Sequence, residues 1–150
     1  MSDCSLTLVP ATSIYPLPRQ RAATLVNWLM AEQVISSIAS RCTLGSQPGY
    51  APAAGAAAVS ARPHLLPYGL AVNGLRIIIG RQVFDTGSLA LTVVRCPACL
   101  HNLVDKEWDL GPWDNQASAL LTCLQCHTAA DIQAYTFEPA WGFSNLGFRF

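Results

Sequence analysis

Four of the six cysteines form two matched pairs, and their type and spacing indicate metal chemistry. Cys96 and Cys99 lie in RCPACLHN, Cys123 and Cys126 lie in LTCLQCHT, and together they read C-x2-C-x23-C-x2-C. Two such turns can direct four soft thiolates at one centre, which is the ligand set of a tetrahedral zinc site. The sequence therefore predicts structural Zn²⁺, with no coordination position left open for catalysis.

Other readings of these cysteines stay open at this point. Iron in a rubredoxin-type site uses the same four thiolates, and spacing does not separate the two metals. A thioredoxin-like redox pair would need one CxxC at the start of a helix that follows a strand, which fits two matched pairs poorly. Buried thiols without a metal are the remaining alternative.

Two histidines, His101 and His127, lie beside the cysteine pairs. Four thiolates already complete a tetrahedral shell, so we expect these histidines to support the ligands by hydrogen bonding or to lie at the surface. Cys4 and Cys42 match no ligand pattern and are expected to be small apolar residues. No Ser-His-Asp or paired-carboxylate arrangement is supported, so we do not predict an enzyme. A zinc enzyme, which would need a metal with three protein ligands and a bound water, is the least favoured alternative.

Composition and charge limit the class of protein. The 150 residues are 51% hydrophobic and 12% charged, with formal net charge zero, whereas soluble domains average about 25% charged residues. Affinity for nucleic acid depends on neutralising phosphates, and the arginines here are scattered. A nucleic-acid-binding function, our alternative hypothesis, needs one basic face assembled from Arg19, Arg21, Arg41, Arg62, Arg76 and Arg81.

The sequence also suggests a compartment. It has no apolar stretch of 18 residues, and the segment MSDCSLTLVP has an acid where a secretory signal needs positive charge. We therefore expect a cytoplasmic protein without a membrane span. In that compartment CxxC pairs favour metal over disulfides.

The expected fold is α+β, with an N-terminal helix packed on an antiparallel β-meander and a hairpin module that holds zinc. A strand is expected near residues 6–10, and a helix over residues 19–40 that Pro18 opens and whose core face includes Trp28. Residues 45–63 are predicted to be a loop, with a short helix at 51–61.

Strands are predicted over residues 68–94. Asn73-Gly74 between apolar runs predicts a type I′ hairpin turn, and Asp85-Thr86-Gly87 predicts a second turn. The meander would then deliver Cys96 at a strand end. Three segments result, an α+β segment at 1–94, the zinc module at 95–131 and a β segment at 132–150 that returns to the sheet, expected to form one compact unit.

The insert VDKEWDLGPWDNQ, residues 104–116, combines tryptophans with acids. Acidic side chains around the metal module would repel nucleic acid and suit a basic protein partner. The candidate partner-binding residues are Trp108, Trp113, Asp105, Glu107 and Asp109. The equal alternative is that Trp108 and Trp113 cover the module's own small core.

The pair CPAC and CLQC resembles the zinc-ribbon superfamily over residues 94–130. The chain departs from that pattern because Leu100 and His127 stand where a glycine often follows the second cysteine. The ending FEPAWGFSNLGFRF resembles short bacterial proteins to which no activity is attached. Small bacterial proteins of acidic or neutral charge include many immunity proteins. By analogy with them, we expect a zinc-stabilised protein-binding module, of inhibitor or immunity type.

Overall fold

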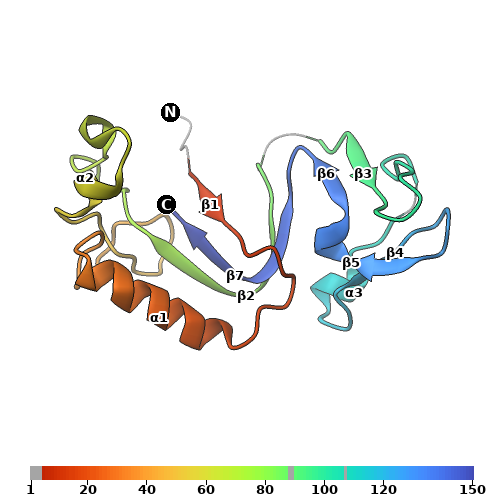
Figure 1. The fold of residues 1–150 in the computed structure, drawn as a ribbon, viewed down its shortest axis with the longest axis horizontal. Helices are drawn as coiled ribbons and strands as arrows, with labels where there is room; N and C mark the ends of the chain where they lie inside the picture. Colours follow the sequence, from red (N-terminus) through yellow and green to blue (C-terminus); the bar gives the residue numbers. More distant parts are fainter. Residues whose placement is uncertain (1–4, 88–89, 107) are drawn as a thin grey trace. The chain divides into compact units, whose positions relative to one another are not determined.

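The computed structural model describes residues 5–87, 90–106 and 108–150, so Cys4 and Glu107 lie outside the described residues. It is a mixture of one long helix, short helices and small antiparallel sheets (Figure 1). The helices are α1 (Pro18–Ala31), α2 (Ala56–Val59), α3 (Gly111–Asp114) and the 3-10 turns η1 (Pro63–Leu65) and η2 (Ile132–Ala134). The strands are β1 (Thr7–Leu8), β2 (Arg76–Phe84), β3 (Val93–Arg95), β4 (Leu120–Thr122), β5 (Ala129–Asp131), β6 (Thr136–Glu138) and β7 (Gly142–Arg149).

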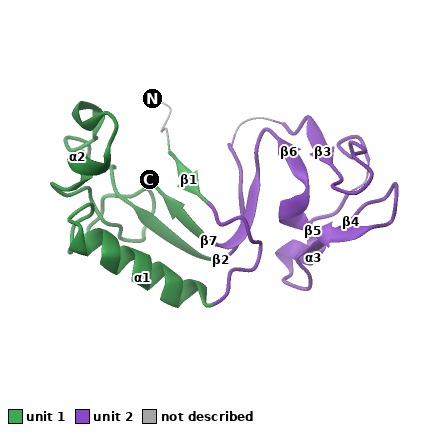
Figure 2. Cartoon of the chain, viewed as in Figure 1, with its two compact units in different colours: residues 1–8, 17–79, 147–150 green, residues 9–16, 80–146 purple. Residues whose placement is uncertain are grey.

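Two compact units divide the chain, and each holds half of it (Figure 2). Unit 1 comprises residues 1–8, 17–79 and 147–150, and unit 2 comprises residues 9–16 and 80–146. Strands β2 and β7 each run from one unit into the other. This division differs from the three consecutive segments expected from the sequence, because distant stretches of chain join in each unit. None of the described helices is long and apolar enough to cross a membrane.

Helix α1 begins at Pro18, as predicted, but ends at Ala31 rather than near residue 40. Gln33 adopts the left-handed conformation, with φ 55°. The N–H of Val34 then donates to the carbonyl of Leu29, and that of Gln33 to Met30, which is the Schellman pattern that closes a helix. Glycine is the usual residue at that left-handed position, so the sequence carried no stop signal.

The strands do not form the predicted meander. β2 pairs with β7 rather than with β3, in a sheet of order β1-β7-β2, and β3 pairs antiparallel with β6. Successive residues of β7 are buried, among them Phe143 and Ser144, which suits a central strand covered on both faces. The predicted strands near residues 6–10, before Cys96 and at the chain end are present, but their partners are distant in sequence.

The predicted hairpin at Asn73-Gly74 is wrong. Both N–H groups donate to the carbonyl of Cys42, and Gly74 is absent from the positions with positive φ. A Cβ on Gly74 would lie 2.2 Å from the Cys42 sulfur. This glycine therefore permits close packing and does not supply a turn. The turn at 85–87 is present, with the Gly87 N–H donating to the Asp85 carboxylate.

Unit 1 has a small apolar core. Its buried apolar side chains in the described range are Ala22, Val26, Ile35, Cys42, Ala56, Leu75 and Phe148. Trp28, which the sequence placed on the core face of the helix, is 55% exposed. Residues 45–63 are mostly irregular, as predicted, although the short helix α2 covers only Ala56–Val59.

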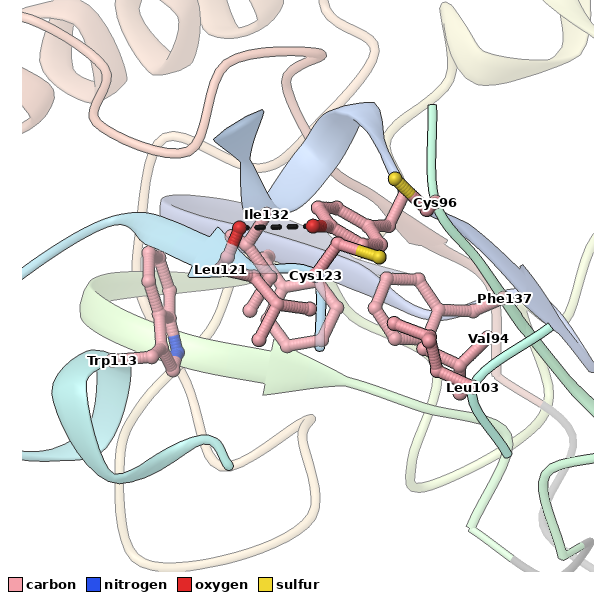
Figure 3. Packing of buried hydrophobic residues seen from close by; sticks show 10 residues of the cluster. Val94, Cys96, Leu103, Trp113, Leu121, Cys123, Ile132 and Phe137 are labelled. Carbon is pink, nitrogen blue, oxygen red and sulfur yellow. Dashed lines mark hydrogen bonds between the residues drawn. The ribbon is translucent and has the colours of Figure 1, made fainter. Parts of the chain in front are cut away.

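Unit 2 has a larger core built around aromatic rings (Figure 3). Phe143 is fully buried; its ring centroid lies 4.9 Å from that of Phe137 and 5.7 Å from that of Trp113. Residues 9–16 are held in this unit by side-chain hydrogen bonds. Gln133 donates to the carbonyl of Pro10, and the amide of Asn145 bonds the backbone of Tyr15.

Candidate metal centre

The four predicted ligands lie together in unit 2. Their sulfur atoms are all within 4.8 Å of one another. Cys96 and Cys126 sulfurs are 3.8 Å apart, and those of Cys99 and Cys123 are 3.7 Å apart. A tetrahedron with Zn–S bonds of about 2.3 Å has sulfur–sulfur edges of roughly 3.8 Å. These two pairs therefore already have the spacing that a tetrahedral metal–thiolate centre requires.

Two turns with the same hydrogen-bond pattern present these sulfurs. In the first, the Cys96 N–H donates to the His101 carbonyl at 3.1 Å and the Leu100 N–H to the Cys96 carbonyl at 3.0 Å. In the second, Cys123 donates to Thr128 at 3.0 Å and His127 to Cys123 at 2.8 Å. β3 leads into the first turn, and β4 and β5 flank the second. We call these turns the knuckles, residues 96–101 and 123–128.

Each knuckle contains a residue in the left-handed conformation, at the position where the resemblance expects glycine. Leu100 has φ 62° and His127 has φ 59°. A side chain costs about 1–2 kcal/mol in this conformation. The backbone geometry that glycine usually provides is thus present in this chain, and the strain is borne by a leucine and a histidine.

Backbone N–H groups converge on the sulfurs. Ala98 donates to the Cys96 sulfur at 3.3 Å, and Gln125 donates to the Cys123 sulfur at 3.4 Å. Burial alone raises the pKa of Cys96, but the hydrogen bonds from Cys99, Ala98 and the neighbouring thiols outweigh it and lower the pKa. Such donors stabilise the thiolate, which is the form that binds a metal.

The second cysteines of the two knuckles differ in their pKa. Hydrogen bonds from the hydroxyl and the N–H of Thr128, opposed by burial, lower the pKa of Cys126 to about 6. At Cys99 the N–H of His101 lowers the pKa, but burial and the hydrogen bonds with the other thiols prevail and raise it to about 12.

Three supporting residues were missed from the sequence. Asn102 closes the first knuckle, because its amide oxygen accepts from Val94 and Val104 and its amide nitrogen donates to Thr92. Tyr135 donates to the Leu121 carbonyl at 2.9 Å (Figure 3). Burial and then the charges of Cys96 and Cys123 raise its pKa. Thr128, which hydrogen-bonds to Cys126, is the third. Its position two residues after Cys126 is the sequence signal that could have identified it.

The two histidines contribute through their backbones. His101 supplies the carbonyl that accepts from Cys96, and His127 supplies the N–H that donates to Cys123. Both side chains are exposed. Cys96 and Cys123 are fully buried, and Figure 3 shows them among the side chains of the buried cluster. Cys126 is half-buried and Cys99 is exposed, so the centre lies at the surface of the unit on that side.

The tryptophans of the acidic insert pack into unit 2. Trp113 is only 2% exposed, and the Arg81 guanidinium lies 5.0 Å from its ring centroid. Trp108 is half-buried and lies against Phe137 at 5.9 Å. This arrangement is the alternative in which both rings cover the module's own core. Asp105 and Asp109 are exposed, although Asp109 also accepts from the Gly111 N–H; Glu107 lies outside the described residues.

Formal charge is segregated between the two units, although the whole chain is neutral. Unit 1 has six arginines against two acids, a net charge of +4, and unit 2 has three basic residues against seven acids, a net charge of −4. Arg76 and Arg81 donate to the carbonyls of Leu44 and Ser118, so these two are already engaged within the protein. Arg19, Arg21, Arg41 and Arg62, all in unit 1, are exposed.

Comparison with known proteins adds no family. No protein-family description, no curated protein sequence and no solved structure matches this chain. The cysteine cluster and its surroundings are therefore the features that bear on the function of this chain.

Proposed function

We propose that the protein is a zinc-stabilised protein-interaction module, in which Cys96, Cys99, Cys123 and Cys126 hold one structural Zn²⁺. The observation that supports this most directly is the convergence of four sulfurs within 4.8 Å. Hydrogen-bond donors on the sulfurs stabilise the thiolates that zinc needs. Four thiolates complete a tetrahedral shell, so the proposed role of the metal is to stabilise the fold and not to bind substrate.

The metal is tested on protein purified without added metal and under reducing conditions. We expect one equivalent of zinc by elemental analysis, and loss of zinc on replacement of any one cysteine. One equivalent of iron would reassign the metal but keep the site. Less than about half an equivalent of any transition metal in intact, reduced protein would contradict the proposal, because a closed four-thiolate site retains its metal tightly.

The binding partner we propose is a protein. Unit 2 has net charge −4, to which four thiolates around Zn²⁺ add a formal −2, and this field attracts basic surfaces and repels phosphates. Asp105, Asp109 and Asp114 are exposed acids of the insert. The proposal, including its inhibitor or immunity variant, predicts one stoichiometric protein on purification from the native host. Repeated recovery of the protein with no stoichiometric protein partner would count against it.

Nucleic acid is the second candidate, and the net charge of unit 1 is the observation that favours it. Arg19, Arg21, Arg41 and Arg62 are exposed there, whereas Arg76 and Arg81 already donate to backbone carbonyls. A gel-shift with generic duplex DNA and single-stranded RNA at low salt tests it. Binding that weakens steeply as salt rises would support this candidate, and no binding at about 50 mM salt would remove it.

A further inference from the structure

The knuckles present an apolar surface around the exposed sulfur of Cys99. Its members are the exposed residues Pro97, Ala98, Leu100 and Leu124, which we call the knuckle surface. Leu100 follows Cys99 and Leu124 follows Cys123, and the sulfurs of those two cysteines are 3.7 Å apart. The two leucines therefore project from adjoining turns. Leu100 is 64% exposed and Leu124 is 49% exposed.

Leu100 is an energetically unfavourable residue at its position. Its left-handed backbone disfavours any side chain, and its exposure means that packing within the described chain does little to offset the strain. Glycine would remove the strain and the exposed apolar surface together. Strained and exposed side chains of this kind gather at functional surfaces, and an interaction that buries Leu100 would offset the strain.

The charges specify what such a surface would bind. Arg95 donates to the Leu100 carbonyl, but unit 2 as a whole has net charge −4, and four thiolates around Zn²⁺ would add a formal −2 beside this surface. These charges favour a partner that combines apolar side chains with positive charge. Unit 1 has this composition. Its net charge is +4, and twelve of the sixteen large apolar residues that are exposed in the described chain belong to it, including Trp28, Leu65, Tyr68 and Leu70.

We infer that the partner of the knuckle surface is a second copy of this chain, whose unit 1 supplies the basic and apolar counterpart. The inference rests on the proposed interaction module and names its partner. A two-fold axis would repeat the contact in both directions, so the contact between a knuckle surface and a unit 1 occurs twice and the assembly closes as a dimer. Reciprocal contacts also supply area toward the roughly 1,200–2,000 Å² that stable interfaces bury.

Sedimentation equilibrium of the metal-loaded protein tests the inference. We expect a concentration-dependent dimer whose dissociation constant rises roughly tenfold or more between about 50 and 500 mM NaCl, because salt screens the opposed charges. The double variant Leu100→Gly/Leu124→Ser should weaken the dimer by a further factor of roughly ten or more, since it removes two apolar anchors. Its metal content should be retained, and its thermal midpoint at a concentration where both proteins are monomeric should not fall, because glycine suits the left-handed position.

The matched control is Leu120→Ser, which removes a similarly exposed leucine, 53%, from β4 outside the knuckles. It should leave the dimer unchanged. A monomer at all concentrations up to about 200 µM, with one equivalent of metal bound, overturns the inference while the metal site stands. A dimer whose dissociation constant is unchanged in the Leu100→Gly/Leu124→Ser variant also overturns it. So does a stoichiometric foreign protein in place of the second copy. Absence of metal contradicts the proposed function instead.

Discussion

Unit 1 and unit 2 have equal lengths, but they bury their side chains differently. Among the described residues, unit 2 buries twelve apolar side chains and leaves four large ones exposed, whereas unit 1 buries seven and exposes twelve. The buried set of unit 2 includes three phenylalanines, Trp113 and Tyr135; that of unit 1 is mostly small residues with one phenylalanine. Apolar composition is therefore a poor guide to core size, because half of the chain leaves much of its apolar surface in water.

This difference in burial means that the two units differ in what can stabilise them. Small units bury too little surface to be stable by packing alone, and they need a metal, a disulfide or a partner. Unit 2 combines aromatic packing with a cysteine cluster suited to a metal. Unit 1 has an apolar surface that suits a partner.

The largest expected effect is the loss of unit 2 when a ligand is removed. Cys123→Ser should abolish metal binding and unfold unit 2, because structural zinc contributes about 10–16 kcal/mol in zinc-finger peptides. The indole N–H signals of Trp108, Trp113 and Trp141 should lose their dispersion in the NMR spectrum. Trp28, in unit 1, should change least. Cys42→Ala is the control, and unchanged indole signals in Cys123→Ser would contradict a structural metal.

Truncating one aromatic ring in each unit compares their cores directly. Phe143→Ala should lower the free energy of unfolding by about 3–5 kcal/mol, since the ring is fully buried against Phe137 and Trp113. Trp28→Ala should lower it by less than about 0.5 kcal/mol, because the indole is exposed. Urea unfolding measures both. Equal losses would mean that Trp28 is buried in solution, for example against a second copy of the chain.

The close approach at Gly74 tests the packing of unit 1. Gly74→Ala should lower the free energy of unfolding by about 1–3 kcal/mol, because the new Cβ would lie 2.2 Å from the Cys42 sulfur. Combining it with Cys42→Ala should recover part of that loss. Strict additivity of the two changes would show that this contact is not the cause.

Acidification should weaken metal binding through Cys126. Its pKa in the folded protein, about 6, lies below the usual value of 9.0, so the fold favours the thiolate. The stability gained from that preference is present above the unfolded pKa and is lost as pH falls through about 6. Zinc affinity should therefore fall more steeply with decreasing pH below about 6 than above it, because protons then compete for Cys126 as well as for the other ligands. At pH 7.5, calorimetry in buffers of different ionisation enthalpy should show release of fewer than four protons.

The smallest effects concern the left-handed residues, which occur in both units. Gln33→Gly in unit 1 and His127→Gly in unit 2 should each raise stability, by up to about 1 kcal/mol, because glycine adopts positive φ without strain. Thermal unfolding of each variant measures the gain. Loss of stability in His127→Gly, but not in Gln33→Gly, would assign the imidazole a role in the metal centre.

Much of the site was predictable because its geometry is local. CxxC turns have a fixed shape, so Cys96 with Cys99 and Cys123 with Cys126 were paired before any fold was known. The start of α1 was predictable for a similar reason, since Pro18 sets its own φ. The end of α1 was not predictable, because the left-handed residue that closes the helix is Gln33 and not the glycine that usually marks such a position. The function of Gly74 depends on Cys42, a distant residue, and no local pattern reveals it.

The sequence by itself therefore determined the four candidate ligands, their pairing into knuckles, the mixture of helix and antiparallel strand, and the acidic character of the insert. Only the tertiary structure decided that β7 is central in a sheet with β1 and β2, that residues 9–16 belong with unit 2, and that Trp113 is buried. It also revealed that a neutral chain consists of a basic and an acidic unit. Strand partners and burial depend on contacts between distant residues, and those contacts arise from the packing of the whole chain.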